Sequence, residues 1–508
     1  MKRFISLVII LVMLVPFAAC RKSPDKEADS SPVPTETATE KPADPTSEPV
    51  IPTAEPTDGH DGELPKVFAG DDVFFILYPD GSLYGWGNNI HGQVGIGSTD
   101  FVRTPVYVAD GLRPVYIGET VFALDSEGGL WGWGSNEGYA LGLGDTFDRT
   151  KPEKILSGVT EFACLEDGCM YALTENGDLL KWSYAPWDDL TDYEKDVAGT
   201  PSVCYENVKY FDEDFIITRG GDLIKRWGDF EKIAENVSEV YGFDGWSTIY
   251  KGTDDTLYEL RKVWESDETK LLTVCESVRT VIFRGAGHTY VLKEDGALYN
   301  YVHPFIRDQE TEPQLIFMMD GVKELIEASS ISEIWACDAN FALKENGELW
   351  AWGEIDGLPL GRKDGEDLSV PALVAEDVRA VYTNGGQTYL ILTNGEVWAT
   401  GLNDADCSSI GAGAEQNGNV KGLFVKLAIE NAAYIATRLT ADQRYATKAG
   451  EDEYEGIWYT GTIVYARTFA VLKDGTILAW GYNGDGCLGA GSADKIVYTP
   501  SEVCPEGR

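Results

Sequence analysis

The stretch DGSLYGWGNNIHGQVGIG occupies residues 80–97, and degraded copies of it recur as far as the C-terminus. Residues 126–144 contain SEGGLWGWGSN followed by ALGLG, and residues 474–491 contain DGTILAWGYN followed by CLGAG. Self-similarity at a fixed period is the signature of a repeat architecture. The repeat therefore decides the fold before any single residue is interpreted.

Each copy encodes a strand, a tight turn and a second strand. A glycine that follows Asp or Asn between two apolar runs marks a hairpin turn that needs a positive φ. Eight copies carry an aromatic residue six positions before the turn glycine, and Leu, Val or Ile stands two positions after it. The turn glycines that we single out are Gly81, Gly177, Gly296, Gly347, Gly395 and Gly475.

Five copies place a tryptophan five positions after the turn glycine, usually with a glycine behind it. An aromatic at a fixed repeat position is more often packing than a ligand site. The Gly-rich tails that follow lack the Lys and the strand-loop-helix setting of a phosphate loop. We therefore interpret both features as structural. The residues at these positions are Trp86, Gly87, Trp133, Gly134, Trp182, Trp352 and Trp480.

The spacing of the copies predicts the architecture. A further short apolar run precedes each hairpin and another often follows it, which makes about four strands per unit. The apolar positions after the turns are 34 to 51 residues apart, except for 80 residues between Val397 and Ile477. Periods of 40 to 50 residues with hairpin turns favour a β-propeller over a helical solenoid. The long interval contains either an eroded unit around Gln443 to Gly461 or a long insertion.

The repeated string is similar to a known one. Aromatic-Ala-Leu-x-x-Asp/Asn-Gly-x-Leu-x-x-Trp-Gly-x-Asn, then Gly-Gln-x-Gly-x-Gly, then Thr-Pro, resembles the RCC1 repeat, named for a regulator of chromosome condensation. The match is nearly complete over 75–105 and strong over 122–152, 341–371 and 469–500, but the units from 215 to 301 depart from it. The resemblance implies an all-β propeller, typically of seven blades, that serves as a protein-binding platform.

The number of units differs from that typical number. We recognise nine units over residues 67–508, and ten units are the alternative, so the blade count stays open. We expect a single closed RCC1-like β-propeller over 67–508. Two smaller propellers are the less favoured alternative, because no linker interrupts the repeats.

The N-terminus predicts export and lipid attachment. Lys2 and Arg3 precede an apolar run over 4–19 that ends in Ala-Ala-Cys, so we assign residues 1–19 to a lipoprotein signal peptide. Cys20 would be lipidated, as in a bacterial lipobox, although Phe17 stands where that motif prefers Leu. Ordinary signal cleavage is the alternative. No other run approaches the ~18 apolar residues that a membrane span needs.

The segment after the signal is rich in Pro, Thr, Glu, Asp and Ala and holds almost no large apolar residues. It cannot bury enough surface to offset the entropy of ordering. We therefore interpret residues 20–66 as the lipidated cysteine and a disordered tether. The predicted location is extracytoplasmic, lipid-anchored to the membrane and exposed at the cell surface.

Charge and cysteine content restrict the partners. The chain has 84 acidic and 41 basic residues, for a net charge of −43, which disfavours nucleic acid because phosphate contact needs a basic surface. The remaining cysteines lack zinc spacing and no EF-hand loop is present, so we expect no metal or cofactor. Cys164 and Cys169 flank a turn-like segment, and we expect a local disulfide there.

No local motif indicates catalysis. The chain has four histidines, and none has a Ser or Cys nucleophile beside it; His91, for example, lies in the first Gly-rich tail. A nucleophile elbow, a phosphate loop and a His-Glu zinc motif are also missing from the sequence. We therefore assign no catalytic, cofactor-binding or metal-binding residue.

Irregular loops on a rigid scaffold are the better candidates for ligand contact. Residues 184–201 replace a Gly-rich tail with a loop that combines aromatic side chains and carboxylates, as sugar and peptide contacts do. A second candidate lies in the long interval. A solvated acidic loop is the plain alternative for each. The candidate residues are Trp187, Asp188, Asp189, Tyr193, Glu451, Asp452, Glu453 and Trp458.

These observations favour an envelope-anchored, non-catalytic scaffold that binds an unknown envelope or extracellular protein or a polysaccharide. One alternative is an extracellular carbohydrate-active enzyme that uses carboxylates on propeller loops. Another is a structural envelope assembly factor. Specific function is to be sought where the repeat fails, namely in the units from Phe215 to Tyr301, the loop after Trp182 and the 80-residue interval.

Overall fold

The computed structural model describes residues 64–505, with gaps at 166–167, 184–198, 227–229, 264–267, 284–288, 303–313, 329–338, 354–358, 364–365, 404–408, 414–419, 448–456 and 493. The chain divides into two compact units, Met1–Pro45 and Thr46–Arg508, and every described residue belongs to the second. Among the described residues, no helix has the length and apolar character needed to cross a membrane.

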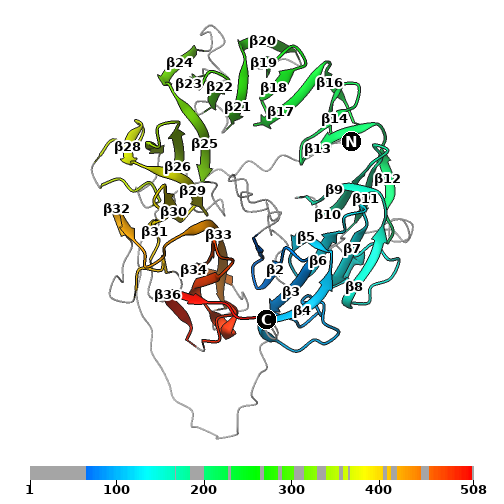
Figure 1. Ribbon diagram of the computed structural model, residues 1–508. Helices are drawn as coiled ribbons and strands as arrows, with labels where there is room; N and C mark the ends of the chain where they lie inside the picture. The colour runs from blue at the N-terminus through cyan, green and yellow to red at the C-terminus, as the bar shows by residue number, and fades with distance from the viewer. Residues whose placement is uncertain are drawn as a thin grey trace, which may run out of the picture. The chain divides into compact units, whose positions relative to one another are not determined.

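The described strands form nine sheets, each built from four consecutive antiparallel strands. Figure 1 shows the sheets following one another around a common centre, with first strands such as β25 and β33 toward that centre and fourth strands such as β8 and β24 at the rim. The fold is therefore an all-β, nine-bladed propeller, which confirms the predicted fold class and the nine sequence units. The seven blades typical of the resemblance do not apply to this chain.

Blades 1 to 3 consist of β1 (Lys66–Ala69), β2 (Val73–Leu77), β3 (Ser82–Gly87) and β4 (Val102–Asp110); β5 (Arg113–Ile117), β6 (Thr120–Leu124), β7 (Leu130–Gly134) and β8 (Arg149–Leu156); and β9 (Val159–Cys164), β10 (Cys169–Thr174), β11 (Leu179–Ser183) and β12 (Ser202–Tyr205). Blades 4 to 6 consist of β13 (Val208–Phe211), β14 (Phe215–Thr218), β15 (Leu223–Lys225) and β16 (Lys232–Ala234); β17 (Val237–Phe243), β18 (Ser247–Gly252), β19 (Thr256–Lys262) and β20 (Thr269–Glu276); and β21 (Val278–Ile282), β22 (Thr289–Lys293), β23 (Leu298–Val302) and β24 (Gln314–Met319).

Blades 7 to 9 consist of β25 (Val322–Ala328), β26 (Ala339–Lys344), β27 (Leu349–Gly353) and β28 (Ala372–Ala375); β29 (Val378–Thr383), β30 (Gln387–Leu392), β31 (Val397–Gly401) and β32 (Val420–Lys426); and β33 (Ala432–Thr447), β34 (Ile457–Leu472), β35 (Ile477–Tyr482) and β36 (Ile496–Glu502). Two short 3-10 helices, η1 (Glu137–Tyr139) and η3 (Gly484–Gly486), lie between the third and fourth strands of blades 2 and 9.

The two ends of each blade carry different connections. One end holds the turn between the second and third strands, as at 78–81, and the link to the next blade, as at 111–112. We call this end the turn face. The opposite end joins the first strand to the second and the third to the fourth, as at 88–101, and we call it the loop face.

The turn glycines tie one blade to the next at several junctions. There the first residue of a blade donates its N–H to the carbonyl of the preceding turn glycine, as from Val208 to Gly177 at 2.8 Å and from Val322 to Gly296 at 2.9 Å. The turn itself requires the left-handed backbone that glycine adopts without strain. The predicted turn glycines have φ between +83° and +89°, and they are Gly81, Gly177, Gly296, Gly347, Gly395 and Gly475.

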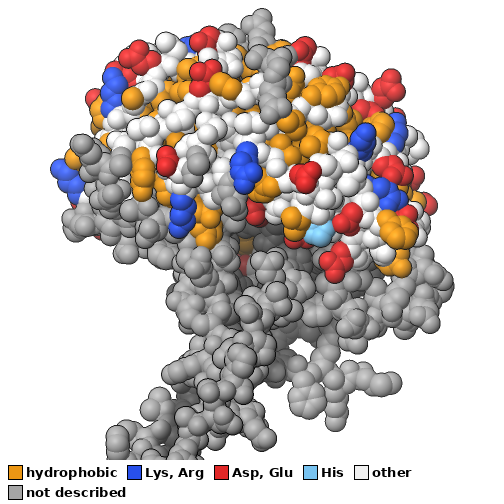
Figure 2. All heavy atoms as spheres, turned by 90° about the horizontal axis from the view of Figure 1, so that it is seen from below, with side chains coloured by type: hydrophobic (Ala, Val, Ile, Leu, Met, Phe, Trp, Pro, Cys, Tyr) orange, Lys and Arg blue, Asp and Glu red, His pale blue; other side chains and the backbone are white. Residues whose placement is uncertain are grey.

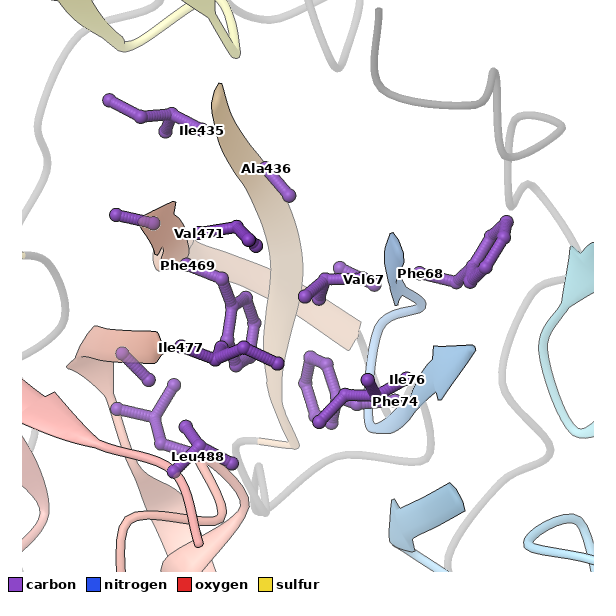
Figure 3. Packing of buried hydrophobic residues seen from close by; sticks show 14 of the residues in the cluster. Val67, Phe68, Phe74, Ile76, Ile435, Ala436, Phe469, Val471, Ile477 and Leu488 are labelled. Atoms are coloured by element: carbon purple, nitrogen blue, oxygen red, sulfur yellow. The ribbon is translucent and has the colours of Figure 1, made fainter. Parts of the chain in front are cut away.

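The ring closes by side-chain packing between two complete blades, because the described strands of blade 1 and blade 9 form separate sheets. The Tyr434 hydroxyl of β33 accepts a hydrogen bond from Val67 N at 2.9 Å and donates to Pro65 O at 2.7 Å. Figure 3 shows Phe74 of β2 facing Phe469 of β34, and their ring centroids are 5.5 Å apart. One apolar cluster therefore spans the first and last blades.

The 80-residue interval is an insertion and adds no tenth blade. β33 and β34 pair continuously from Ala432 opposite Leu472 to Thr447 opposite Ile457. Only the segment from Arg467 to Val471 of β34 also pairs with β35. The remainder of the two strands extends beyond the blade at the loop face as a two-stranded ribbon. Of the two readings left open by the sequence, the long insertion is correct.

The expected disulfide between Cys164 and Cys169 is wrong, since both side chains are thiols. The register of β9 and β10 places Cys164 opposite Met170, one residue beyond Cys169. Side chains alternate between the two faces of a sheet, so the two sulfurs point to opposite sides. Cys164 accordingly packs in the cluster that contains Met170, and Cys169 packs in the neighbouring cluster with Leu165.

Candidate binding face

The loop face is built on a clamp that repeats between neighbouring blades. Trp133 Nε1 of blade 2 donates to Gln93 O in the loop of blade 1 at 2.8 Å, and Trp182 Nε1 of blade 3 donates to Ala140 O of blade 2 at 2.8 Å. Trp86 Nε1 makes the same bond to Cys487 O of blade 9 at 2.7 Å, across the closure. Each tryptophan thereby fixes the Gly-rich loop of the blade before it.

These loop positions have no room for a side chain, because the tryptophan ring of the next blade lies against them. A Cβ on Gly95 would lie 2.9 Å from Trp133 Nε1, and one on Gly142 would lie 3.0 Å from Trp182 Nε1. A Cβ on Gly87 or Gly134 would collide with the carbonyl oxygen of Asp72 or Glu119. The tryptophans singled out from the sequence are all buried, namely Trp86, Trp133, Trp182, Trp352 and Trp480. The tryptophans in these hydrogen bonds thus pack between blades, whereas Gly87 and Gly134 pack against the first connection of their own blade.

The clamp changes chemistry where the sequence pattern fades. Arg226 stands at the tryptophan position of blade 4, and its Nη1 donates to the Tyr171 hydroxyl of blade 3 at 2.6 Å. Tyr301 stands there in blade 6, and its hydroxyl donates to Glu259 Oε2 of blade 5 at 2.5 Å. Sequence analysis missed both, because each partner lies in another unit.

Glu259 is a fully buried carboxylate with a complete set of donors. Ser247 Oγ, Arg261 Nε, Arg261 Nη2 and Tyr301 Oη approach it at 2.6, 2.8, 2.7 and 2.5 Å. Burial raises the pKa of Glu259, but these hydrogen bonds and the Arg261 charge outweigh it and hold the pKa below its usual value. Burial and the Glu259 charge raise the pKa of Tyr301. The ion pair lies within blade 5 and the Tyr301 hydrogen bond joins it to blade 6, and we call this group the ion-pair clamp.

Charged pairs also hold the loop face at the ring closure. Arg438 Nη2 contacts Asp71 Oδ1 at 3.0 Å, and Arg467 Nη2 contacts Asp72 Oδ1 at 2.9 Å. Burial lowers the pKa of Arg467, yet Cys487 and Asp72 together raise it above its ordinary value. Because Arg467 is buried and lies beneath the ribbon of β33 and β34, it fixes the base of the ribbon to blade 1.

Raised carboxyl pKa values are a usual sign of catalytic acids, and the loop face contains one at Asp212. Burial raises the pKa of Asp212, which accepts hydrogen bonds from Asp214 N at 2.9 Å and Phe215 N at 2.7 Å. Asn384 forms the same two bonds in blade 8, to Gly386 N and Gln387 N. An amide serves equally well at this position, so the carboxylate is explained by capping of the loop.

The turn face carries a groove of about 660 Å³ across blades 1 to 3. Its lining is mixed and includes Leu64, Lys66, Tyr78, Arg113, Asp125 and Glu175. A hydrogen bond from Trp131 Nε1 holds the pKa of Asp125 below its usual value. Leu64 lies in this lining, so the described chain enters blade 1 from the turn face.

The two faces differ in the length of the connections between their strands. On the turn face, no connection exceeds the five residues of 427–431. On the loop face, the segments 184–201, 354–371 and 402–419 each join a third strand to a fourth, and the ribbon of blade 9 projects there as well. Insertions are tolerated where they do not disturb the scaffold, and binding residues concentrate on such loops. The loop face is therefore the candidate binding face.

Most of the ligand-binding candidates from the sequence belong to these connections. Trp187, Asp188, Asp189 and Tyr193 lie outside the described residues, between β11 and β12. Glu451, Asp452 and Glu453 also lie outside them, between β33 and β34. The backbone of Trp458 lies in β34 opposite Ala446. Lipidation of Cys20 likewise concerns a residue beyond the described range.

The face seen in Figure 2 carries charges of both signs. Figure 2 shows acidic and basic side chains interspersed in the view from below, with apolar side chains between them. Within the residues that the structure describes, no group of three or more His, Cys, Asp or Glu side chains has the arrangement of a metal site.

The chain is similar to known proteins that contain the same repeat. The family described as "Regulator of chromosome condensation (RCC1) repeat" matches residues 80–117 and 127–170. The E3 ubiquitin-protein ligases HERC2 of Mus musculus and Homo sapiens are each 26% identical over 172 residues, which is 32% of this chain and 3% of each relative. The chain thus spans only a small part of the length of these curated relatives.

Solved structures with a similar fold include yeast RCC1 bound to Kap60, at 15% identity and a TM-score of 0.42, with 93% of this chain and 91% of that chain covered. Human WBSCR16 is similar at 13% identity and a TM-score of 0.37, with 83% and 94% covered. The matched repeats and the nine described blades together identify the chain as an RCC1-like β-propeller.

Proposed function

We propose that this protein is an envelope-anchored, non-catalytic scaffold that binds a protein partner through its loop face. The observation that carries the proposal is the difference in connection length between the two faces. Every turn-face connection has five residues or fewer, whereas long segments such as 184–201 and the ribbon of blade 9 belong to the loop face.

The point at which the described chain enters blade 1 supports the same orientation. The chain enters β1 from the turn face at Leu64 and Pro65, and Pro65 O is held there by the Tyr434 hydroxyl. A lipid on Cys20 would lie at the far end of residues 20–66. If largely extended, those residues span at most about 140 Å, at roughly 3.1 Å per residue. The tether would therefore join the face opposite the long loops.

The absence of a local catalytic motif and the structural role of Asp212 support a non-catalytic role. Incubation of the full-length protein with cell-wall and host glycans tests this part. We expect no products, and products that disappear in an Asp212→Asn variant would overturn it.

Site-specific photo-crosslinking in intact cells tests the binding face. A benzophenone amino acid is placed at Glu137 on the loop face or, as the matched control, at Asn176 on the turn face; both positions are exposed. We expect discrete crosslinked proteins from position 137 and none from position 176. The reverse result would assign binding to the turn face.

Fractionation tests the predicted anchor separately. The full-length chain is expected in the membrane fraction and to incorporate radiolabelled palmitate, and a Cys20→Ala variant is expected to do neither. Membrane retention and label incorporation by the variant would remove the lipid anchor from the proposal.

A further inference from the structure

Two large apolar side chains project from the loop face of blades 1 and 2. Ile90 is 62% exposed and Phe147 is 74% exposed, and Phe147 is the most exposed large apolar side chain in the described part of the chain. They lie in the segments 88–101 and 135–148, which the sequence pattern assigns to packing. Exposure of these two side chains is therefore a feature that the structural role of the Gly-rich tails does not explain.

The backbone of each loop is fixed from inside by a buried asparagine. Asn89 Nδ2 donates to Ser98 O at 2.9 Å and to Asp100 O at 3.0 Å, while its Oδ1 accepts from Val94 N. Asn136 does the same in blade 2, with Nδ2 donating to Asp145 O at 2.7 Å. Both asparagines have no exposed surface. Each loop is therefore closed on itself before any partner arrives.

The two loops are also fixed to each other. His91 Nδ1 and Asp148 Oδ2 are 2.9 Å apart, and these residues directly adjoin Ile90 and Phe147 in the chain. Gly97 N of the first loop donates to Thr150 O of blade 2 at 2.7 Å. The two apolar side chains thus project from neighbouring segments that are held together.

Phe147 has a restrained main chain beneath an exposed ring. Its N–H donates to Asp145 Oδ1 at 2.9 Å, and its carbonyl accepts from Arg149 Nη1 at 2.5 Å. Arg149 is itself held by Asp145 and Glu153. An aromatic ring presented on a fixed backbone loses little entropy on binding, which is the property of interface anchor residues.

The two loops that carry these side chains are acidic, and the adjoining Arg149 is paired with two carboxylates, Asp145 and Glu153. Segments 88–101 and 135–148 contain four acidic residues and no Lys or Arg. Three of them, Asp100, Glu137 and Asp148, are exposed. A hydrogen bond from Arg149 holds the pKa of Asp145 below its usual value, so this carboxyl is ionised at neutral pH. An apolar pair with an acidic surround is complementary to an apolar anchor flanked by cations.

We propose that Ile90 and Phe147 form a preorganised docking point for a basic protein segment, in which an apolar side chain is flanked by Lys or Arg. This inference rests on the proposed function, because it locates the partner's contact on the loop face. A stable interface buries about 800 Å² on each side, so the pair would act as its anchor and neighbouring loops would supply the rest.

The adjoining blade offers such a neighbour. Gly144 N of blade 2 donates to Gly199 O at 2.7 Å, which places the end of the 184–201 connection against the loop that carries Phe147. Residues 199–201, the described end of that connection, therefore lie on the same part of the loop face as Phe147.

A peptide-display selection on the immobilised full-length protein tests the inference, with random 12-residue peptides as the probe. We expect enriched peptides to be rich in Lys and Arg around an aromatic or aliphatic residue. An Ile90→Ala/Phe147→Ala variant is expected to bind them roughly tenfold more weakly or worse. A Leu423→Ala variant is the matched control, since Leu423 is also 62% exposed but lies at the blade 8 rim, and its binding should be unchanged.

Added salt should weaken the wild-type interaction, because the flanking contacts are charged and solvent-exposed. Acidic consensus peptides, equal binding to the double variant, or a failure to enrich any peptide would overturn the docking point. If peptides bind the double variant and still compete with crosslinking from position 137, the docking point is wrong but binding through the loop face still stands. If crosslinking from position 137 also fails, the proposed function falls with the inference.

Discussion

The junction between blades 1 and 2 and the junction between blades 5 and 6 solve the same problem with different side chains. Trp133 Nε1 donates across the first to Gln93 O, and the Tyr301 hydroxyl donates across the second to the buried carboxylate of Glu259. Arg226 at the blade 3 and 4 junction is a third version, donating to the Tyr171 hydroxyl. In these junctions the retained feature is a donor that reaches the preceding blade, and the tryptophan is one way to supply it.

The two kinds of junction differ in the defect that remains when one side chain is removed. Removing a tryptophan leaves a cavity and one carbonyl without a donor. Removing Glu259 or Arg261 leaves the other charge without its counter-charge, which is the more costly defect. At the junction of blades 5 and 6, an ionic group therefore replaces the tryptophan, and its stability depends on both Glu259 and Arg261.

The largest effect is expected from Glu259→Ala. The substitution leaves the Arg261 guanidinium, the Ser247 hydroxyl and the Tyr301 hydroxyl without their acceptor in a buried junction. Breaking a buried pair from one side costs about 3–5 kcal/mol, and we expect a loss of this size in the free energy of unfolding. Urea denaturation of the full chain measures it, and a loss below about 1 kcal/mol would contradict the ion-pair clamp.

Two glycine substitutions test how strongly the tryptophan restricts the loop at the junction of blades 1 and 2. Gly95 and Gly111 have φ values of +88° and +71°, so an alanine is strained at both. Only at Gly95 does the new Cβ also meet the Trp133 ring, whereas nothing lies within 4 Å of it at Gly111. We expect losses of about 3 kcal/mol for Gly95→Ala and about 1 kcal/mol for Gly111→Ala, measured by denaturant unfolding. Equal losses would show that the tryptophan does not restrict the loop.

Much of this arrangement could be predicted from the sequence, because it is local and repeated. The turn glycines, the Trp-Gly positions and the count of nine units follow from residues that recur at fixed offsets. The Glu259 clamp could not be predicted, because Tyr301 is 42 residues away and YELRK in β19 looks like an ordinary strand with an exposed acid.

The binding face was only partly accessible from sequence for similar reasons. The 80-residue interval could be located but not interpreted, since an eroded unit and an extended hairpin both contain two apolar strands. Ile90 and Phe147 lie in Gly-rich loops whose glycines and asparagines are packed. The repeat pattern describes each loop as a whole, so it does not show that these two side chains are exposed. Structure was needed to separate the packed positions of each tail from the exposed ones.

Conservative removal of the donor compares the two junctions directly. Trp133→Phe leaves Gln93 O without its bond, and Tyr301→Phe leaves Glu259 with Ser247 and Arg261. An unsatisfied buried acceptor costs about 1–3 kcal/mol, so we expect losses in this range from both variants. Similar losses by chemical denaturation would support the donor as the retained feature. A neutral Tyr301→Phe would show that the hydroxyl is dispensable and that Arg261 alone satisfies the carboxylate.

The smallest effect is a difference in acid sensitivity that only the ionic junction should produce. Because the folded pKa of Glu259 lies below the unfolded value of 4.5, its ionisation contributes stability above that value and the contribution is lost as pH falls through the folded pKa. A Glu259→Gln variant lacks this titration, so its free energy of unfolding should fall less steeply than that of the wild type between about pH 5 and about pH 3. The same comparison with Trp133→Phe should show parallel curves, since no ionisable group is removed. Parallel curves for Glu259→Gln would instead mean that the pKa of Glu259 is the same in the folded and unfolded protein. A wild type that falls less steeply than Glu259→Gln would mean that Glu259 is protonated in the folded protein, and the junction would then be held by neutral hydrogen bonds.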